Sequence, residues 1–129
     1  MPPTAQDAQD LAYFCTWSMN ESSTQMTTPP PIAFVYILTN QYHTVLYVGM
    51  TTDLPTRLWE HKRKINPKSF TARYNVEKPV YFEGFQSVEE ALERERYIKG
   101  KTRKWKEELI KLRNVDWIDL TNEIFAMRK

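Results

Sequence analysis

Five residues between positions 36 and 95 have side chains of the types that phosphodiester hydrolysis requires. They are two tyrosines, an arginine, a histidine and a glutamate: Tyr36, Tyr47, Arg57, His61 and Glu95. Hydrolysis needs a water nucleophile, a base that takes its proton, and positive charge on the phosphate. The planar guanidinium of Arg57 suits a phosphate because it can bond two oxygens at once. Either tyrosine or the histidine is a candidate base or a group that orients the water.

A carboxylate on the inward side of a predicted helix is the most informative residue of the second half. Glu95 lies three residues after Leu92 and three before Ile98, on the apolar stripe that should face the core. A buried carboxylate costs free energy unless it is paired or bound to a metal. Glu95 is therefore the candidate ligand for Mg²⁺ or Mn²⁺, which would supply Lewis acidity. A salt bridge to Arg57 or to a lysine is the structural alternative.

Each of the other residues also has an ordinary structural explanation when it is taken alone. Tyrosines on strands usually pack in a core. Arg57 could be a solvated helix residue or pair with Glu60, and a single histidine is more often a surface or hydrogen-bonded residue than a catalyst. Chemistry is indicated only if all five residues act together, which depends on the elements that position them.

Two strands are expected to carry the tyrosines. Residues 33–39 are apolar on both alternating faces, which is typical of a central strand covered on each side. The strand pattern resumes at residues 44–49. If residues 40–43 form the loop between them, Tyr36 lies directly opposite Tyr47 and on the same face of an antiparallel pair.

A helix is expected to begin soon after Gly49 and to carry the arginine and the histidine. Asp53 is a good N-cap residue, and Pro55 is tolerated in the first turn because the N–H groups there lack helical partners. Arg57 and His61 are four residues apart and therefore share one face of this helix.

The remaining segments predict one more strand and two more helices. Residues 78–85 form the third strand, the capping box at residues 87–90 starts the second helix, and Thr102 caps the third. Gly100 is the expected C-cap of the second helix. The predicted order is β-β-α-β-α-α, an α/β (α+β) fold in which a small three-stranded antiparallel sheet is flanked by helices.

Length and composition favour one domain. The chain has 129 residues, and its single cysteine fits a reducing cytoplasm, which is the expected location. We expect no membrane association, because no apolar run approaches the ~18 residues that a membrane span needs. Residues 1–31 lack periodicity and predict a flexible leader, residues 32–125 the domain, and residues 126–129 a tail.

The basic residues are unevenly distributed. Residues 1–56 contain no lysine or arginine, whereas residues 57–129 contain all 18 of them. Such asymmetry indicates a polyanionic partner, although solvated helices are also often rich in lysine. We expect contacts to nucleic acid from six cations: Lys64, Lys68, Arg73, Lys99, Lys101 and Arg103.

The same residues resemble the motifs of the GIY-YIG nuclease family. Residues 34–36 (Phe-Val-Tyr) resemble the first half-motif with its tyrosine kept, and residues 47–49 (Tyr-Val-Gly) match the second half-motif closely. The family's arginine, and its histidine or tyrosine one turn later, fall on Arg57 and His61. Its metal-binding glutamate falls on Glu95.

The resemblance extends over most of the chain, about residues 33–120. It is greatest to small stand-alone members, which share a stretch similar to residues 70–75 (F-T-x-x-Y-N) and one similar to residues 94–100. The family's downstream active-site asparagine has no clear match near residues 101–106.

The resemblance implies an endonuclease that hydrolyses DNA with one divalent metal ion. It implies that Tyr36 is the general base, Tyr47 orients the water, Arg57 holds the scissile phosphate, His61 assists proton transfer or the phosphate, and Glu95 binds the metal. Repair or processing of branched DNA is the expected setting, with a protein partner that supplies substrate specificity. The alternatives are a non-catalytic nucleic-acid-binding module that keeps the fold, or a protein-interaction domain that uses aromatic residues of the leader.

Overall fold

The computed structural model of the protein describes residues 29–127. The predicted leader therefore lies almost wholly outside the described residues, as do the last two residues of the predicted tail. The described chain begins against the sheet, since the Gln86 side chain donates to the carbonyl of Pro29 at 2.8 Å and the Ile32 N–H donates to the carbonyl of Phe85 at 2.9 Å. Within the described part, every helix is too short or too polar to cross a bilayer.

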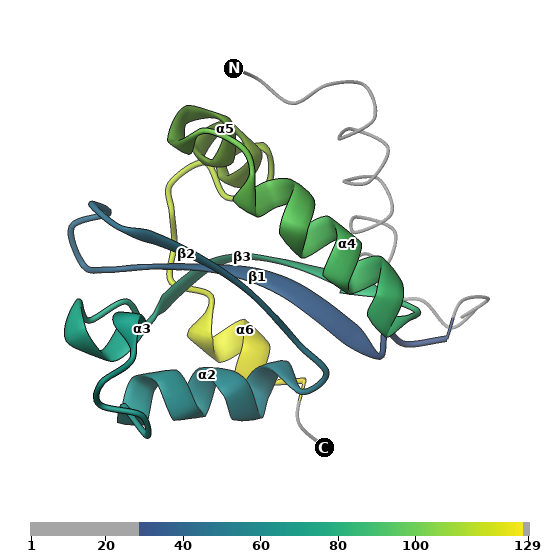
Figure 1. The fold of residues 1–129 in the computed structure, drawn as a ribbon, viewed down its shortest axis with the longest axis horizontal. Coiled ribbons are helices and arrows are strands. Elements are labelled where there is room, and N and C mark those ends of the chain that lie inside the picture. The colour runs from purple at the N-terminus through teal and green to yellow at the C-terminus, as the bar shows by residue number, and fades with distance from the viewer. Residues whose placement is uncertain (1–28, 128–129) are drawn as a thin grey trace.

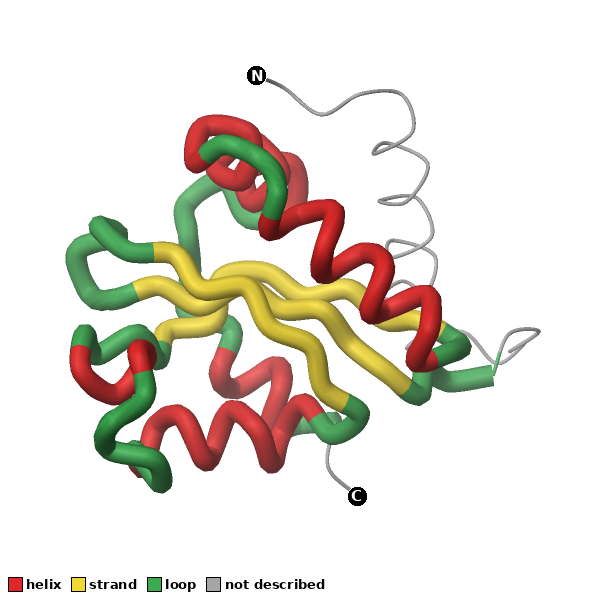
Figure 2. Tube along the Cα trace, viewed as in Figure 1, coloured by secondary structure: helices red, strands yellow, loops and turns green. Residues whose placement is uncertain are grey.

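Three antiparallel strands form the sheet, as predicted. They are β1 (Ala33–Thr39), β2 (Leu46–Thr51) and β3 (Lys78–Phe85), in the spatial order β2-β1-β3. All seven residues of β1 are buried, so the prediction of a central strand covered on both faces is confirmed. Figure 2 shows β1 between its two neighbours.

Helices cover both faces of this sheet. They are α2 (Leu54–Arg63), α3 (Phe70–Arg73), α4 (Val88–Lys99), α5 (Arg103–Arg113) and α6 (Thr121–Phe125). Figure 1 shows α4 and α5 on one side of the sheet and α2, α3 and α6 on the other. The α+β fold class is confirmed, and the short helices α3 and α6 are additions that the sequence patterns did not predict.

The predicted helix caps are present. The side chains of Asp53, Ser87 and Thr102 each accept a hydrogen bond from the backbone N–H three residues later, at 3.1–3.2 Å. Gly100 is the C-cap of α4, but it has right-handed helical backbone angles and not the left-handed ones for which a cap glycine is usually selected.

The register of the two tyrosine strands differs from the prediction. Tyr36 lies opposite Gly49, and Tyr47 lies opposite Leu38, so the prediction of a directly opposed tyrosine pair is wrong. Both tyrosines still lie on one face of the sheet, because residues 47 and 49 of a strand point the same way.

The shift arises because the loop spans residues 40–45 and not 40–43. The Asn40 carbonyl oxygen Oδ1 accepts from the N–H of Thr44 at 2.8 Å and from that of Val45 at 3.3 Å. These two N–H groups are therefore occupied by the asparagine and are not available to the strand ladder, which starts at Leu46.

The two faces of the sheet carry different polar residues. Tyr36 alternates along β1 with Val35 and Ile37, whose partners on β3 are Glu83 and Tyr81. Glu83 and Tyr81 therefore lie on the face opposite to Tyr36.

On that opposite face, α4 buries an ion pair. The Arg94 guanidinium bonds both carboxylate oxygens of Glu83, with Nε–Oε1 at 2.9 Å and Nη2–Oε2 at 2.8 Å, and the Tyr81 hydroxyl donates to Oε2 at 2.5 Å. The side chains of Arg94 and Glu83 are only 5% and 1% exposed. The fully buried charge on α4 is thus Arg94, whereas the predicted inward carboxylate, Glu95, lies at the margin of the buried stripe.

Candidate active site

On the face of the sheet that carries Tyr36 and Tyr47, both tyrosine rings pack closely over Gly49. Gly49 has no side chain, and a Cβ atom there would lie 2.5 Å from the hydroxyl oxygen of Tyr36 and 2.9 Å from the ring of Tyr47. Because such contacts are too short for any real Cβ, only glycine lets the Tyr36 ring occupy this place. The ring of His61 then meets both tyrosines, with centroids 5.9 Å from Tyr36 and 5.6 Å from Tyr47.

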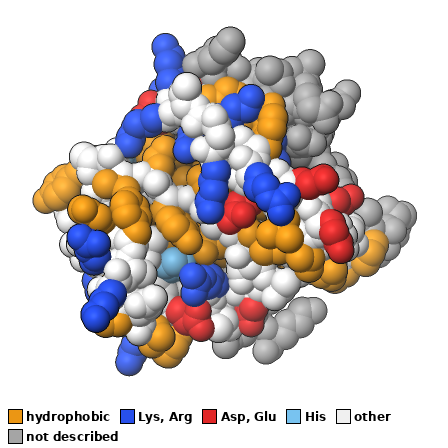
Figure 3. All heavy atoms as spheres, viewed as in Figure 1, with side chains coloured by type: hydrophobic (Ala, Val, Ile, Leu, Met, Phe, Trp, Pro, Cys, Tyr) orange, Lys and Arg blue, Asp and Glu red, His pale blue; other side chains and the backbone are white. Residues whose placement is uncertain are grey.

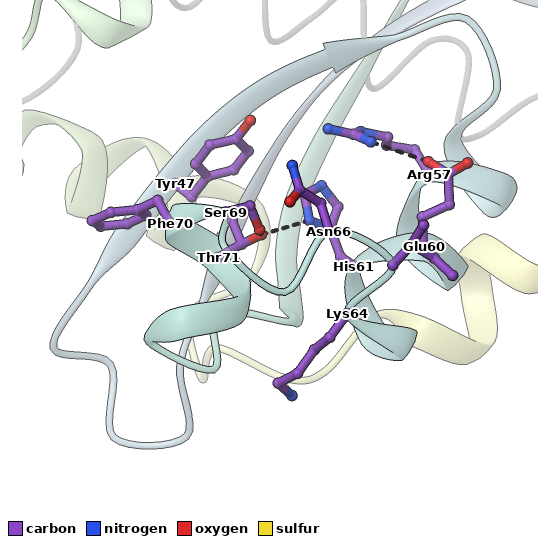
Figure 4. Close-up of a pocket in the computed structure, with 10 residues that line it drawn as sticks. Tyr47, Arg57, Glu60, His61, Lys64, Asn66, Ser69, Phe70 and Thr71 are labelled. Atoms are coloured by element: carbon purple, nitrogen blue, oxygen red, sulfur yellow. Dashed lines mark hydrogen bonds and ion pairs between the residues drawn. The ribbon is translucent and has the colours of Figure 1, made fainter.

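A chain of hydrogen bonds runs from Tyr36 into the loop before α3. The Tyr36 hydroxyl lies 3.1 Å from His61 Nε2, and His61 Nδ1 lies 3.0 Å from Thr71 Oγ1. Thr71 in turn lies 3.3 Å from the hydroxyl of Ser69, which caps α3. Figure 4 shows the contact between Thr71 and His61. The side chains of Tyr36, His61 and Thr71 are buried, so this network has fixed partners.

Burial and the nearby arginine keep the histidine uncharged. Burial, followed by the positive charge of Arg57, lowers the pKa of His61 to about 4, against a small opposing effect of Glu60. At neutral pH its ring therefore has one N–H donor and one acceptor nitrogen. Which nitrogen carries the proton depends on the hydrogen bond that the other nitrogen makes.

The phenol of Tyr36 is protonated at neutral pH. Burial, then the neighbouring Tyr47, raise the pKa of Tyr36 well above its usual value, and Glu95 adds to the rise while Arg57 opposes it. An ionised Tyr36 is therefore rare, and this tyrosine can act as a base only if its own proton moves to an acceptor. His61 is the neutral acceptor beside it.

A cleft opens beside this network, with a volume of about 380 Å³. Its walls come from β2, α2, α3 and the loop between α2 and α3: Tyr47, Arg57, Glu60, His61, Lys64, Ile65, Asn66, Ser69, Phe70 and Thr71. In Figure 4 the Arg57 side chain extends from α2 toward Tyr47 over His61. Three of the five predicted site residues therefore line the cleft, namely Tyr47, Arg57 and His61. The buried Tyr36 lies behind them and bonds His61.

Arg57 has an ion-pair partner and stays accessible. Its Nη1 lies 3.0 Å from Glu60 Oε1, the pairing that the sequence offered as the structural alternative, and its side chain is 44% exposed. An exposed pair of this kind stabilises a protein by at most about 1 kcal/mol. A phosphate can therefore compete for the guanidinium at little cost.

Glu95 approaches the site from α4, on the other side of the sheet. Its side chain is 18% exposed, and Oε2 lies 3.3 Å from Lys99 Nζ on the next turn of the helix. The lysine pair that was the structural alternative is therefore present. The charge of Glu95 nevertheless reaches the phenol of Tyr36, whose pKa it helps to raise.

The oxygen donors in this region are compatible with a divalent ion that keeps most of its water ligands. Among residues 29–127, no group of three or more His, Cys, Asp or Glu side chains converges to hold a metal. Mg²⁺ commonly keeps several waters and is held by one or two carboxylates together with substrate phosphates. Glu95 can supply one such oxygen ligand, and the substrate would supply another.

Of the six predicted nucleic-acid contacts, one lines the cleft, and two more lie in the α2–α3 loop and in α3, which contribute residues to its walls. Lys64 lines it and pairs with Glu77 at 2.9 Å. Lys68 is exposed, and the Arg73 guanidinium lies 5.6 Å from the ring centroid of Tyr74.

The other three predicted contacts lie on or beside the α4–α5 turn and have internal partners. Lys99 pairs with Glu95, and the Lys101 ammonium lies 4.4 Å from the ring centroid of Tyr97. Arg103 donates to the backbone carbonyls of the β1–β2 loop and so holds that loop to α5. Figure 3 shows lysine and arginine side chains in both the upper and lower parts of the drawn face, with apolar side chains between them.

Sequence patterns missed the hydroxyl groups that support His61. Ser69 and Thr71 lie in a short segment without helical periodicity, and α3 has only four residues. For Thr71 the available signal was the stretch at residues 70–75 that is shared with small family members, whereas Ser69 lies outside that stretch.

The comparison with known proteins covers this same region. A family model described as the GIY-YIG catalytic domain matches residues 32–108, a range that contains all five site residues. The chain belongs to the GIY-YIG family. GIY-YIG domains are nuclease domains, which agrees with the types of side chain that the cleft brings together.

Relatives of this GIY-YIG protein occur in bacteria. A UPF0213 protein of Clostridium perfringens (strain 13 / Type A) is 37% identical over 91 residues, which are 70% of this chain and 96% of the relative. A UPF0213 protein of Streptococcus pneumoniae serotype 4 is 42% identical over 64 residues, which are 50% of this chain and 64% of the relative. The solution NMR structure of a UPF0213 protein from Bacillus halodurans has 30% sequence identity and a TM-score of 0.44, and the match covers 70% of this chain and 94% of that one.

Proposed function

We propose that this protein is a metal-dependent endonuclease that hydrolyses phosphodiester bonds in DNA. The observation that carries the proposal is the buried Tyr36–His61 hydrogen bond beside the exposed guanidinium of Arg57. This pairing combines a route for a proton with a group that binds phosphate. Membership of a nuclease family supports the proposal further.

In the proposed reaction the proton of the attacking water leaves through Tyr36. The phenol oxygen of Tyr36 takes this proton while its own proton passes to Nε2 of His61, 3.1 Å away. The transfer requires that Nε2 is unprotonated and that the ring proton is on Nδ1, where Thr71 Oγ1 accepts it at 3.0 Å. The water oxygen then bonds to phosphorus, the scissile P–O bond breaks, and the leaving oxygen takes a proton from solvent. Tyr47, which lines the cleft, orients the water.

Arg57 and Glu95 supply the charge that this reaction needs. The guanidinium of Arg57 binds the nonbridging phosphate oxygens and balances the charge that develops on them. Glu95 is the residue that would hold a divalent ion, Mg²⁺ or Mn²⁺. When bound, such an ion supplies Lewis acidity at the phosphate.

The test is cleavage of end-labelled DNA by the purified protein. Single-stranded, duplex and flapped or branched substrates are incubated with Mn²⁺ or Mg²⁺ and with a chelator. Branched substrates are included because we propose DNA repair as the setting. We expect metal-dependent cleavage that Arg57→Ala and Glu95→Gln each reduce by about 10² or more, as loss of an electrostatic stabiliser does.

Two residues that do not line the cleft provide matched controls. Arg63→Ala removes another arginine of α2, and Glu107→Gln removes a carboxylate of α5 that pairs with Arg103. Both should cleave at close to the wild-type rate. Cleavage that persists in Glu95→Gln would contradict the proposal. Tight binding without cleavage on every substrate and metal would favour a non-catalytic binding module.

A further inference from the structure

Two aromatic rings are exposed at one end of the cleft. Phe70 and Tyr74 are 48% and 47% exposed, and their ring centroids lie 4.9 Å apart. Phe70 lines the same cleft as Arg57 and His61. Ile65, which is also exposed, adds a further apolar side chain to the lining of the cleft. Large apolar side chains grouped in the open beside a reactive cleft indicate a ligand surface.

The backbone holds these rings in place before any ligand binds. Ser69 caps α3, the Tyr74 N–H donates to the Phe70 carbonyl at 3.2 Å, and the Val76 N–H donates to the Thr71 carbonyl at 2.8 Å. Thr71 follows Phe70 directly and bonds His61, so the rings and the proton route are fixed by the same short segment. A surface that is ordered in advance loses less entropy on binding.

Positive charge accompanies the exposed rings. The Arg73 guanidinium lies 5.6 Å from the centroid of Tyr74, Lys68 is exposed two residues before Phe70, and Lys64 lines the cleft. Exposed aromatic rings among cations are typical of sites that bind single-stranded nucleic acid, where bases stack on the rings and cations contact the backbone. Paired bases inside a duplex offer no free face for such stacking.

We propose that Phe70 and Tyr74 stack an unpaired base that neighbours the phosphate bound by Arg57. The preferred substrate would then contain unpaired nucleotides, as a single strand, a flap or a branch point does. The position of the scissile phosphate rests on the proposed nuclease function. The stacking itself does not depend on cleavage and can be measured without it.

The test measures binding with the Glu95→Gln variant in a chelating buffer, where no cleavage occurs. The probe is a short oligonucleotide that contains 2-aminopurine, used as a single strand or annealed into a blunt duplex. We expect binding to quench the fluorescence of the single strand, and the single strand to bind about tenfold more tightly than the duplex. Adding Phe70→Leu or Tyr74→Leu should weaken single-strand binding about tenfold, the effect of losing one stacked base, and leave duplex binding unchanged.

Conservative substitutions and a distant tyrosine are the controls. Phe70→Tyr and Tyr74→Phe keep the rings and should keep the affinity, as should Tyr42→Leu, which removes an exposed ring from the β1–β2 loop. Equal affinity for both probes, or equal losses on both probes in the leucine variants, would overturn the inference. If the wild-type protein cleaves nothing but the leucine variants selectively lose single-strand binding, the stacking site stands and the nuclease proposal fails.

Discussion

Two hydrogen-bonded networks on opposite faces of one sheet give a direct comparison. Each contains a buried tyrosine whose pKa burial raises above its usual value, Tyr36 on one face and Tyr81 on the other. Tyr81 bonds a carboxylate that an arginine also holds, and Tyr36 bonds a neutral histidine. The first network is charged and closed, whereas the second is uncharged and borders a cleft.

This difference indicates that the charged network contributes to stability and the uncharged network to catalysis. A fully buried ion pair is tolerated because its charges satisfy each other, and such a network has little freedom to change its protonation. The Tyr36–His61 pair can move a proton, because both groups are neutral and each can donate or accept. We therefore expect substitutions in the charged network to change mainly stability, and those in the neutral network mainly activity.

The largest expected effect comes from breaking the charged network. Arg94→Met leaves the buried carboxylate of Glu83 without its cation, and should lower the free energy of unfolding by about 3–5 kcal/mol. Urea denaturation followed by circular dichroism measures this change. The double variant Glu83→Leu/Arg94→Met should recover most of the loss. A single variant as stable as the wild type would show that the ion pair does not hold α4 to the sheet.

The second effect is a dependence of stability on pH that comes from His61. Its pKa is about 4 in the folded protein, below the ~6.5 of an unfolded histidine. The unfolded chain therefore binds the proton more readily, so this contribution is complete above pH 6.5 and is lost as the pH falls to 4. It is at most about 3 kcal/mol.

Unfolding curves between pH 7 and pH 5 measure this effect with few carboxylates titrating. The His61→Gln variant should lose stability less steeply than the wild type over this range. His43, whose pKa is also lowered by burial and by the nearby Lys78 and Arg103, contributes equally to both proteins. Parallel curves for the two proteins would contradict a neutral, buried His61.

A third and smaller effect is expected from removing the hydrogen bond between Thr71 and Nδ1 of His61. In Thr71→Val, the valine has nearly the same shape as threonine but cannot accept the hydrogen bond from Nδ1 of His61. It should lower kcat about tenfold, a part of the 10²–10⁴ that acid–base catalysis contributes, and change KM little. Thr71→Ser keeps the hydroxyl and should keep the rate.

The tautomer of His61 gives a readout that does not depend on activity. Long-range ¹H–¹⁵N spectra at pH 7 should show the ring proton on Nδ1 in the wild type and a changed tautomer ratio in Thr71→Val. His43 is the only other histidine in the chain, so the two imidazole signals can be assigned with His43→Gln. An unchanged tautomer and an unchanged rate would remove Thr71 from the site.

Local sequence signals predicted the helices and strands, whereas contacts between more distant residues determined the strand register. The helix caps and the buried central strand followed from residue type and spacing, because capping bonds and alternation act over a few residues. The strand register did not follow, because the Asn40 side chain binds two N–H groups of the loop and lengthens it. A pattern of apolar residues contains no information on that contact.

In the candidate site, too, the features that depend on local spacing were predicted and those that depend on distant contacts were not. The positions of Arg57 and His61 on one helix face follow from their spacing. The buried charge of α4 was assigned to Glu95, but Arg94 occupies the core because β3 offers Glu83 as its partner, which only the folded sheet reveals. Thr71 was missed for a similar reason, since its role depends on the approach of a distant segment to His61.

The role of Tyr36 in proton transfer is tested by the single-turnover rate of DNA cleavage by Tyr36→Phe, measured beside Tyr81→Phe. Both substitutions remove one buried hydroxyl, so each should lower stability by about 1 kcal/mol. We expect Tyr36→Phe to lower the rate by about 10² or more and Tyr81→Phe to leave it close to that of the wild type. Cleavage at the wild-type rate by Tyr36→Phe would show that Tyr36 takes no part in the proton transfer.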